Sequence, residues 1–239
     1  MNGKTRHVPS SAPSVHTIEA RTHGRYLVRV PAAPPPWPLL VGFHGYAERA
    51  DDHLNALSTI PGAETWLLVA IQALPPFYTR HERVVANWMT REDREHAIAD
   101  NIEYVGRVLD RIRREHRARP PLVFSGFSQG GAMAYRAAAT YRADGLIILA
   151  ADVPPDVIAR PGVSLPPILI GRGTTDDWYT EAKETADLAA LARTGARVKT
   201  CVFDGGHEWT DAFRAAASAM LQAVMNHEET KDTKDRTPS

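Results

Sequence analysis

Short apolar runs alternate with longer amphipathic stretches through most of this 239-residue chain, and this alternation constrains the fold more than any other feature. The apolar runs have the length of buried strands, whereas the amphipathic stretches have the length and apolar spacing of helices. Strands are expected at residues 39–43, 66–71, 122–125, 146–150, 168–170 and 198–203, and helices at 92–116, 130–141, 181–193 and 210–226. Strands alternating with helices predict an α/β fold, with a mostly parallel sheet covered by helices on both faces.

The two ends of the chain depart from this pattern. Residues 1–14 are expected to form a flexible segment, 15–226 the folded domain, and the highly charged residues 227–239 a disordered tail. Two short alternating stretches at 15–20 and 26–30 flank His23-Gly24, which predicts an N-terminal antiparallel hairpin at the edge of the sheet. The proline-marked connection at 152–167 is too short for a lid domain, so an open site is expected.

Composition excludes several classes of function. The 28 basic and 28 acidic residues balance, which argues against nucleic acid or an anionic membrane as the main partner. The arginine-rich end of the 92–116 helix is interpreted as a solvated face. The single cysteine, Cys201, cannot form an internal disulfide or a multi-cysteine metal site. Residues 1–20 contain no apolar stretch typical of a signal peptide, so a cytoplasmic protein is expected.

The strongest chemical signal is a G-x-S-x-G motif between a predicted strand and a predicted helix. It reads Gly126-Phe127-Ser128-Gln129-Gly130. In this context a sharp turn exposes the serine hydroxyl at the top of the sheet, and glycine at both ends lets strand and helix approach closely. Ser128 is therefore the candidate nucleophile, and the backbone N–H of Gln129 is a candidate oxyanion-hole donor.

A serine nucleophile needs a base and an orienting acid. His207 follows the predicted strand at 198–203 in the loop Gly205-Gly206-His207, which can bring an imidazole back over the sheet. Asp176 and Asp177 follow the strand at 168–170 and thus lie between serine and histidine, in the chain order of one known class of triad. Position alone leaves both aspartates open.

Four segments in order, FHGY at 43–46, GFSQGG at 126–131, GRGTTD at 171–176 and GGHEW at 205–209, resemble the α/β-hydrolase fold. More narrowly, they are similar to the small serine esterases of the phospholipase/carboxylesterase family, which includes acyl-protein thioesterases. The resemblance covers roughly 37–226 and implies Asp176 as the acid and the N–H of Tyr46 as the second oxyanion donor. Where relatives often have further glycines after His-Gly, this chain has Ala47-Glu48-Arg49. Dimers are frequent in the family, so a homodimer is a further expectation.

Three aromatic residues, Phe77, Trp88 and Trp178, are candidates for contacting the substrate, and Trp88 resembles a family feature at the pocket. We expect a serine hydrolase that cleaves small or medium-sized carboxylic esters through an acyl-enzyme, without metal or cofactor. A thioesterase, peptidase or acyltransferase could use the same triad. A non-catalytic binding protein on the same scaffold is the alternative from another class.

Overall fold

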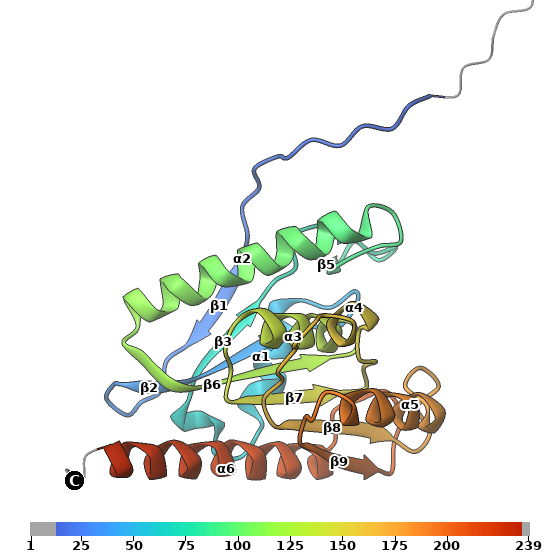
Figure 1. Ribbon diagram of the computed structural model, residues 1–239. Helices are drawn as coiled ribbons and strands as arrows, with labels where there is room; N and C mark the ends of the chain where they lie inside the picture. The colour runs from blue at the N-terminus through green and yellow to red at the C-terminus, as the bar shows by residue number, and fades with distance from the viewer. Residues whose placement is uncertain (1–12, 236–239) are drawn as a thin grey trace, which may run out of the picture.

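A seven-stranded sheet forms the centre of the computed structural model, which describes residues 13–235 (Figure 1). The strand order is β1-β3-β2-β6-β7-β8-β9; β1 is antiparallel to β3 and all the other neighbours are parallel. The strands are β1 (Tyr26–Arg29), β2 (Trp37–Phe43), β3 (Leu67–Ile71), β6 (Ala118–Phe127), β7 (Gly145–Leu149), β8 (Ile168–Gly173) and β9 (Val198–Phe203). A separate hairpin pairs β4 (Pro76–Tyr78) with β5 (Val84–Ala86). The predicted mostly parallel sheet is confirmed.

Helices cover both faces of the sheet, as predicted (Figure 1). The helix α6 (Asp211–Asp235) shares one face with α1 (Ala50–Ser58), and the Arg214 guanidinium of α6 donates a hydrogen bond to the hydroxyl of Thr59 beside α1. On the opposite face α2 packs against α3. The remaining bounds are α2 (Arg94–Glu115), α3 (Gln129–Thr140), α4 (Pro155–Ile158), α5 (Glu181–Ala192) and the short 3-10 helix η1 (Ala63–Thr65).

The connection from β7 to β8 contains α4 as its only helix in the structure, so no lid domain lies above the sheet at this point. Helix α4 is four residues long and is held to α3 by a bidentate ion pair, in which Arg136 contacts Asp156 at 2.7 and 2.8 Å. The prediction of an α/β-hydrolase architecture without a lid domain is confirmed.

The N-terminal antiparallel strand is present, but its partner differs from the prediction. β1 pairs with β3, in the register Tyr26↔Ile71, whereas residues 13–25 contain no strand. The apolar side chains of Val15 and Ile18 are three positions apart, so they would point to opposite faces of a strand. They are 87% and 92% exposed, respectively. Residues 15–20 therefore have no apolar face to bury in a sheet, whereas β1 pairs with β3 and forms the edge strand of the sheet without a hairpin partner before it.

The C-terminal end also differs from the prediction. Residues 227–235 of the predicted disordered tail belong to α6, which continues to Asp235. Charge alone does not end a helix, because glutamate and lysine have good helix propensity and extending an existing helix costs little. No glycine or proline interrupts 211–235. Residues 236–239, and 1–12 of the predicted flexible segment, lie outside the described residues.

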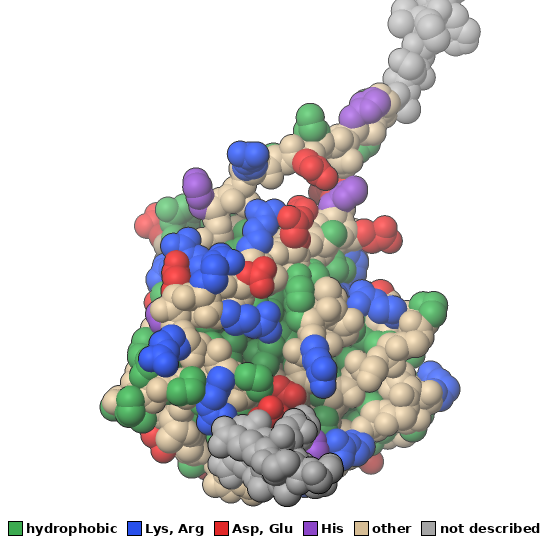
Figure 2. Space-filling model, turned by 60° about the vertical axis from the view of Figure 1, so that its left-hand side comes forward, with side chains coloured by type: hydrophobic (Ala, Val, Ile, Leu, Met, Phe, Trp, Pro, Cys, Tyr) green, Lys and Arg blue, Asp and Glu red, His purple; other side chains and the backbone are tan. Residues whose placement is uncertain are grey.

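The arginine-rich end of α2 carries acidic partners. Arg111 pairs with Glu115 at 2.9 Å, and Arg113 lies 3.8 Å from Asp110, all on an exposed surface. Basic and acidic side chains are interspersed on the face that Figure 2 shows. This arrangement agrees with the interpretation as a solvated face. In residues 13–235, moreover, no helix combines the length and apolar character needed to cross a bilayer.

Two buried histidines make the stability of the fold sensitive to acid. Burial lowers the pKa of His44 to about 4 and that of His53 to about 3, so both are neutral in the folded protein at pH 7. His53 is accommodated because Gly42 in β2 has no side chain that would overlap the imidazole ring. In the unfolded chain a histidine takes up a proton near its ordinary pKa of about 6.5.

We therefore expect His53→Leu to make stability less dependent on pH. Below about pH 6.5 the unfolded wild type binds a proton at His53 that the folded state excludes, so acidification lowers the free energy of unfolding. Between pH 7 and pH 5 this protonation lowers the free energy of unfolding of the wild type by about 2 kcal/mol, and the variant lacks this decrease. Urea unfolding at both pH values measures it. The prediction is refuted if the free energies of unfolding of wild type and variant differ by the same amount at pH 7 and at pH 5.

Candidate active site

The candidate nucleophile, Ser128, lies in the sharp turn between β6 and α3. Its backbone has φ 52° and ψ −124°, a conformation that side-chain-bearing residues rarely adopt. The turn is held by backbone hydrogen bonds from the Ser128 N–H to the Leu149 carbonyl and from the Gly131 N–H to the Ser128 carbonyl, both 2.9 Å. A Cβ at Gly130 would overlap the carbonyl oxygens of Phe43 and His44. This close approach explains why glycine is needed beside the serine, as the sequence predicts.

His207 and Asp176 are in direct contact at the ends of the neighbouring strands β9 and β8. The His207 Nδ1 lies 2.9 Å from Asp176 Oδ2. The other carboxylate oxygen of Asp176 accepts the N–H groups of Trp178 at 2.8 Å and Tyr179 at 2.9 Å. The Asp176 side chain is fully buried, whereas that of His207 is partly exposed. A buried carboxylate on Nδ1 leaves Nε2 as the nitrogen able to accept a proton from a reactant.

Of the two aspartates that sequence position left open, Asp176 contacts the histidine. Asp177 is exposed. The acid loop and the histidine loop are joined through their backbones: the Thr175 N–H and hydroxyl donate to the Gly205 carbonyl at 2.9 and 2.8 Å. A Cβ at Gly173 would overlap the Gly205 and Gly206 carbonyl oxygens. Backbone contacts between the loops after β8 and β9 therefore determine the spacing of Asp176 and His207.

The imidazole lies beside the serine turn. The ring of Phe127, the residue before Ser128, is 4.9 Å from that of His207 between centroids. The structure thus brings together a turn at the end of β6, a histidine after β9 and a carboxylate after β8. All three are at the carboxyl ends of parallel strands, where open α/β sheets bind ligands.

The two candidate oxyanion donors are unpaired backbone groups. Within residues 13–235, neither the Tyr46 N–H nor the Gln129 N–H donates a hydrogen bond to another group of the protein. Gln129 is the first residue of α3, where N–H groups have no partner inside the helix. Tyr46 follows β2 in the loop that starts with His44-Gly45. Free N–H groups from two adjoining loops are what a developing oxyanion requires.

His44 and Trp88 lie behind this loop. The His44 Nδ1 donates to the Gly45 carbonyl at 2.7 Å, and its Nε2 accepts the Ala73 N–H at 3.1 Å. Both nitrogens of the neutral ring are therefore used in backbone contacts, so His44 has a structural role and no free nitrogen to act as a base. The Trp88 indole N–H donates to the His44 carbonyl at 2.8 Å.

The three aromatic residues expected to contact substrate occupy different environments. Trp88 is 0% exposed, so it offers no surface to a ligand and instead supports the His44 loop. Sequence could not show that its N–H would find a partner inside the core. Phe77 is half-buried, with its ring 5.9 Å from that of Tyr46. Trp178 is 74% exposed beside the acid loop, and Tyr46 is 61% exposed.

Sequence reasoning missed several polar groups that hold the site in place. The Gln129 side chain accepts the Trp88 N–H and donates to the Met89 carbonyl, both at 2.9 Å, and so ties the 72–91 loop to α3. Glu48 contacts the backbone of Gly45. The Tyr179 hydroxyl donates to Asp187 at 3.1 Å, and burial raises the pKa of Asp187 to about 6. The only sequence signal for Glu48 is its place in Ala47-Glu48-Arg49, the segment that departs from the family's glycine-rich pattern after His-Gly.

Comparison with known proteins supports the fold. No family model and no curated protein sequence matches the chain. Among solved structures it is similar to a Bacillus cereus carboxylesterase, with 16% identity, a TM-score of 0.66 and coverage of 84% of this chain and 94% of the other. Esterase PE8 is 20% identical, with a TM-score of 0.67 and coverage of 84% of this chain and 99% of the other. Zea mays acyl-protein thioesterase 2 is 18% identical, with a TM-score of 0.64 and coverage of 84% of this chain and 99% of the other. The chain has the α/β-hydrolase fold that these esterases and thioesterases share.

Proposed function

We propose that the protein is a serine hydrolase that cleaves carboxylic esters of small or medium size. The observation that carries the proposal is the convergence of a strained serine turn with the 2.9 Å contact between His207 and Asp176. Structural likeness to esterases and thioesterases supports a hydrolase in general. The assignment to esters rests on the sequence resemblance.

In the proposed mechanism Ser128 attacks the acyl carbon while His207 Nε2 takes the hydroxyl proton. The tetrahedral oxyanion is held by the Tyr46 and Gln129 N–H groups. Its collapse breaks the ester C–O bond, and His207 returns the proton to the leaving alcohol. Water, deprotonated by His207, then attacks the acyl-enzyme and releases the acid and Ser128. Asp176 fixes the imidazole tautomer and stabilises its charged form.

A fluorophosphonate probe tests the nucleophile directly. We expect one covalent adduct on the purified protein, which peptide mapping by mass spectrometry would place at Ser128. Prior heat denaturation should abolish the adduct, because the hydroxyl is activated only in the folded site. A native protein that forms no adduct would favour the alternative of a non-catalytic binding protein.

Substrate panels then distinguish the hydrolase classes. We expect hydrolysis of p-nitrophenyl esters of graded chain length to exceed that of matched thioesters and amides in kcat/KM. The same triad can act on each of these acyl groups, so only their relative rates decide the class. A thioester preference would instead assign the protein to the thioesterases, the second candidate favoured by the likeness to the maize enzyme.

A further inference from the structure

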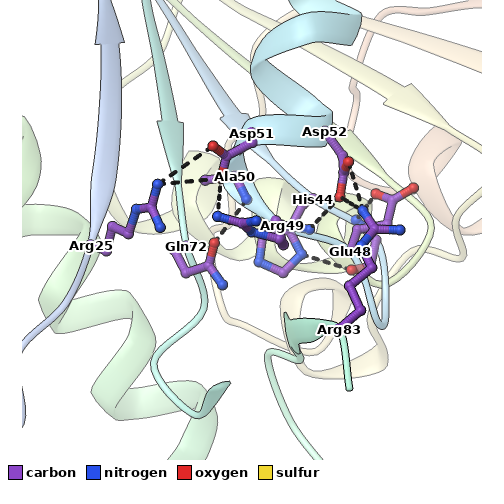
Figure 3. A network of polar contacts seen from close by, with 10 residues as sticks. Arg25, His44, Glu48, Arg49, Ala50, Asp51, Asp52, Gln72 and Arg83 are labelled. Atoms are coloured by element: carbon purple, nitrogen blue, oxygen red, sulfur yellow. Dashed lines mark hydrogen bonds and ion pairs between the residues drawn. The ribbon is translucent and has the colours of Figure 1, made fainter. Parts of the chain in front are cut away.

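Glu48 closes the turn that carries the candidate oxyanion donor Tyr46. Its carboxylate Oε2 accepts the Gly45 N–H at 2.7 Å, and its own N–H donates to the Gly45 carbonyl at 3.3 Å. One residue thus bonds to both polar groups of Gly45, with Tyr46 between them in the chain. Figure 3 shows Glu48 in the polar network that surrounds the His44 loop.

The conformation of this turn needs such support. Ala47 has φ 57°, in the left-handed region that favours glycine. Two backbone hydrogen bonds with β5 hold one side of the turn, from the Ala47 N–H to the Ala86 carbonyl and from the Ala86 N–H to the Glu48 carbonyl. The Glu48 side chain holds the side formed by Gly45. Without it, the Gly45 N–H would lose its partner.

The carboxylate also lies close to the candidate catalytic groups. A Cβ at Gly45 would be 3.0 Å from Glu48 Oε2 and 3.1 Å from the Phe127 ring, which itself contacts His207. The charged groups that act on Glu48 are Asp52, His207 and Arg83. Burial raises the pKa of the Glu48 carboxyl, while the hydrogen bond from Gly45 lowers it. Such a short bond to a charged acceptor is among the stronger hydrogen bonds in proteins.

We propose that Glu48 is a positioning residue of the oxyanion hole, which acts by holding Gly45 so that the Tyr46 N–H faces the reacting oxygen. This inference rests on the proposed function, because it assigns a role within the same acyl-transfer site. The effect on the Tyr46 N–H depends on the side-chain oxygen of residue 48 that accepts the Gly45 N–H. A neutral side chain with an acceptor oxygen at the same position therefore retains most of it.

The test compares Glu48→Ala with Glu48→Gln on a short p-nitrophenyl ester. We expect the alanine variant to lose roughly 10- to 100-fold in kcat, less than the loss of about 10²–10³ caused by removing an oxyanion donor outright. KM should change less than about threefold, because oxyanion donors act mainly in the transition state. Glutamine keeps an acceptor for the Gly45 N–H and should restore kcat to within a few-fold of the wild type.

Asp51→Ala is the matched control. Asp51 belongs to the same network (Figure 3) but pairs with Arg25 and Arg49 on a more exposed surface, so kcat should stay within about twofold of the wild type. The proposal is wrong if Glu48→Ala retains wild-type kcat, if the loss falls on KM alone, or if glutamine is as impaired as alanine. A wild type that hydrolyses no ester, thioester or amide would refute the proposed function itself, and this role with it.

Discussion

Replacing Ser128 with alanine should reduce kcat for a short p-nitrophenyl ester by on the order of 10⁴-fold or more, since no acyl-enzyme can form. The fold should survive, because the hydrogen bonds that hold this turn involve only the backbone of Ser128, namely its N–H to Leu149 and its carbonyl to Gly131. Alanine differs only by the lost hydroxyl. The measurement pairs single-substrate kinetics with a thermal unfolding curve.

Ser164→Ala is a suitable control, because Ser164 is an exposed serine in the connection before β8. It should have wild-type kcat and form the same fluorophosphonate adduct. Substantial turnover by a folded Ser128→Ala protein would remove Ser128 from the mechanism. Loss of folding in that variant would instead contradict the backbone-only account of the turn.

Asp176→Asn should have the second-largest effect, a loss of roughly 10³–10⁴-fold in kcat. The asparagine Oδ1 can still accept the N–H groups of Trp178 and Tyr179, so the loop should keep its shape. The amide NH₂ then faces His207 Nδ1 as a donor. That contact favours the tautomer with its proton on Nε2, which cannot accept the serine proton.

Asp177→Asn provides the matched comparison at the neighbouring position. Asp177 is exposed, and the same change of charge there should alter kcat by no more than about twofold. Wild-type activity in Asp176→Asn, or a larger loss in Asp177→Asn, would move the acid to Asp177. Thermal unfolding of both variants separates a changed tautomer from a disrupted loop.

Buried strands were predictable from sequence because their apolar runs are continuous. The fully buried β3 (Leu67–Ile71) and β7 (Gly145–Leu149) lie within one residue of the expected ranges. The elements that sequence missed have weaker local signals: α1 is nine residues long, and the strands β4 and β5 have three residues each. The β4–β5 hairpin forms where it can contact the His44 loop through Ala86.

Side-chain environments were less predictable than elements. Trp88 was expected to contact substrate, yet it is buried against His44 because its indole N–H finds a carbonyl partner there. In the sequence, Glu48 stands out only as part of a departure from a glycine-rich pattern. Its contact with Gly45 depends on the path of the turn, which residue spacing does not reveal.

The sequence by itself determined the alternation of strand and helix, the glycine-flanked Ser128 and the chain order of serine, acid and histidine. These features depend on local spacing and on residue type. Only the tertiary structure decided which aspartate contacts His207, because adjacent residues in one loop differ in burial and direction rather than in chemistry. It likewise decided that Tyr46 and Gln129 offer free N–H groups, since hydrogen-bond partners come from strands distant in the chain.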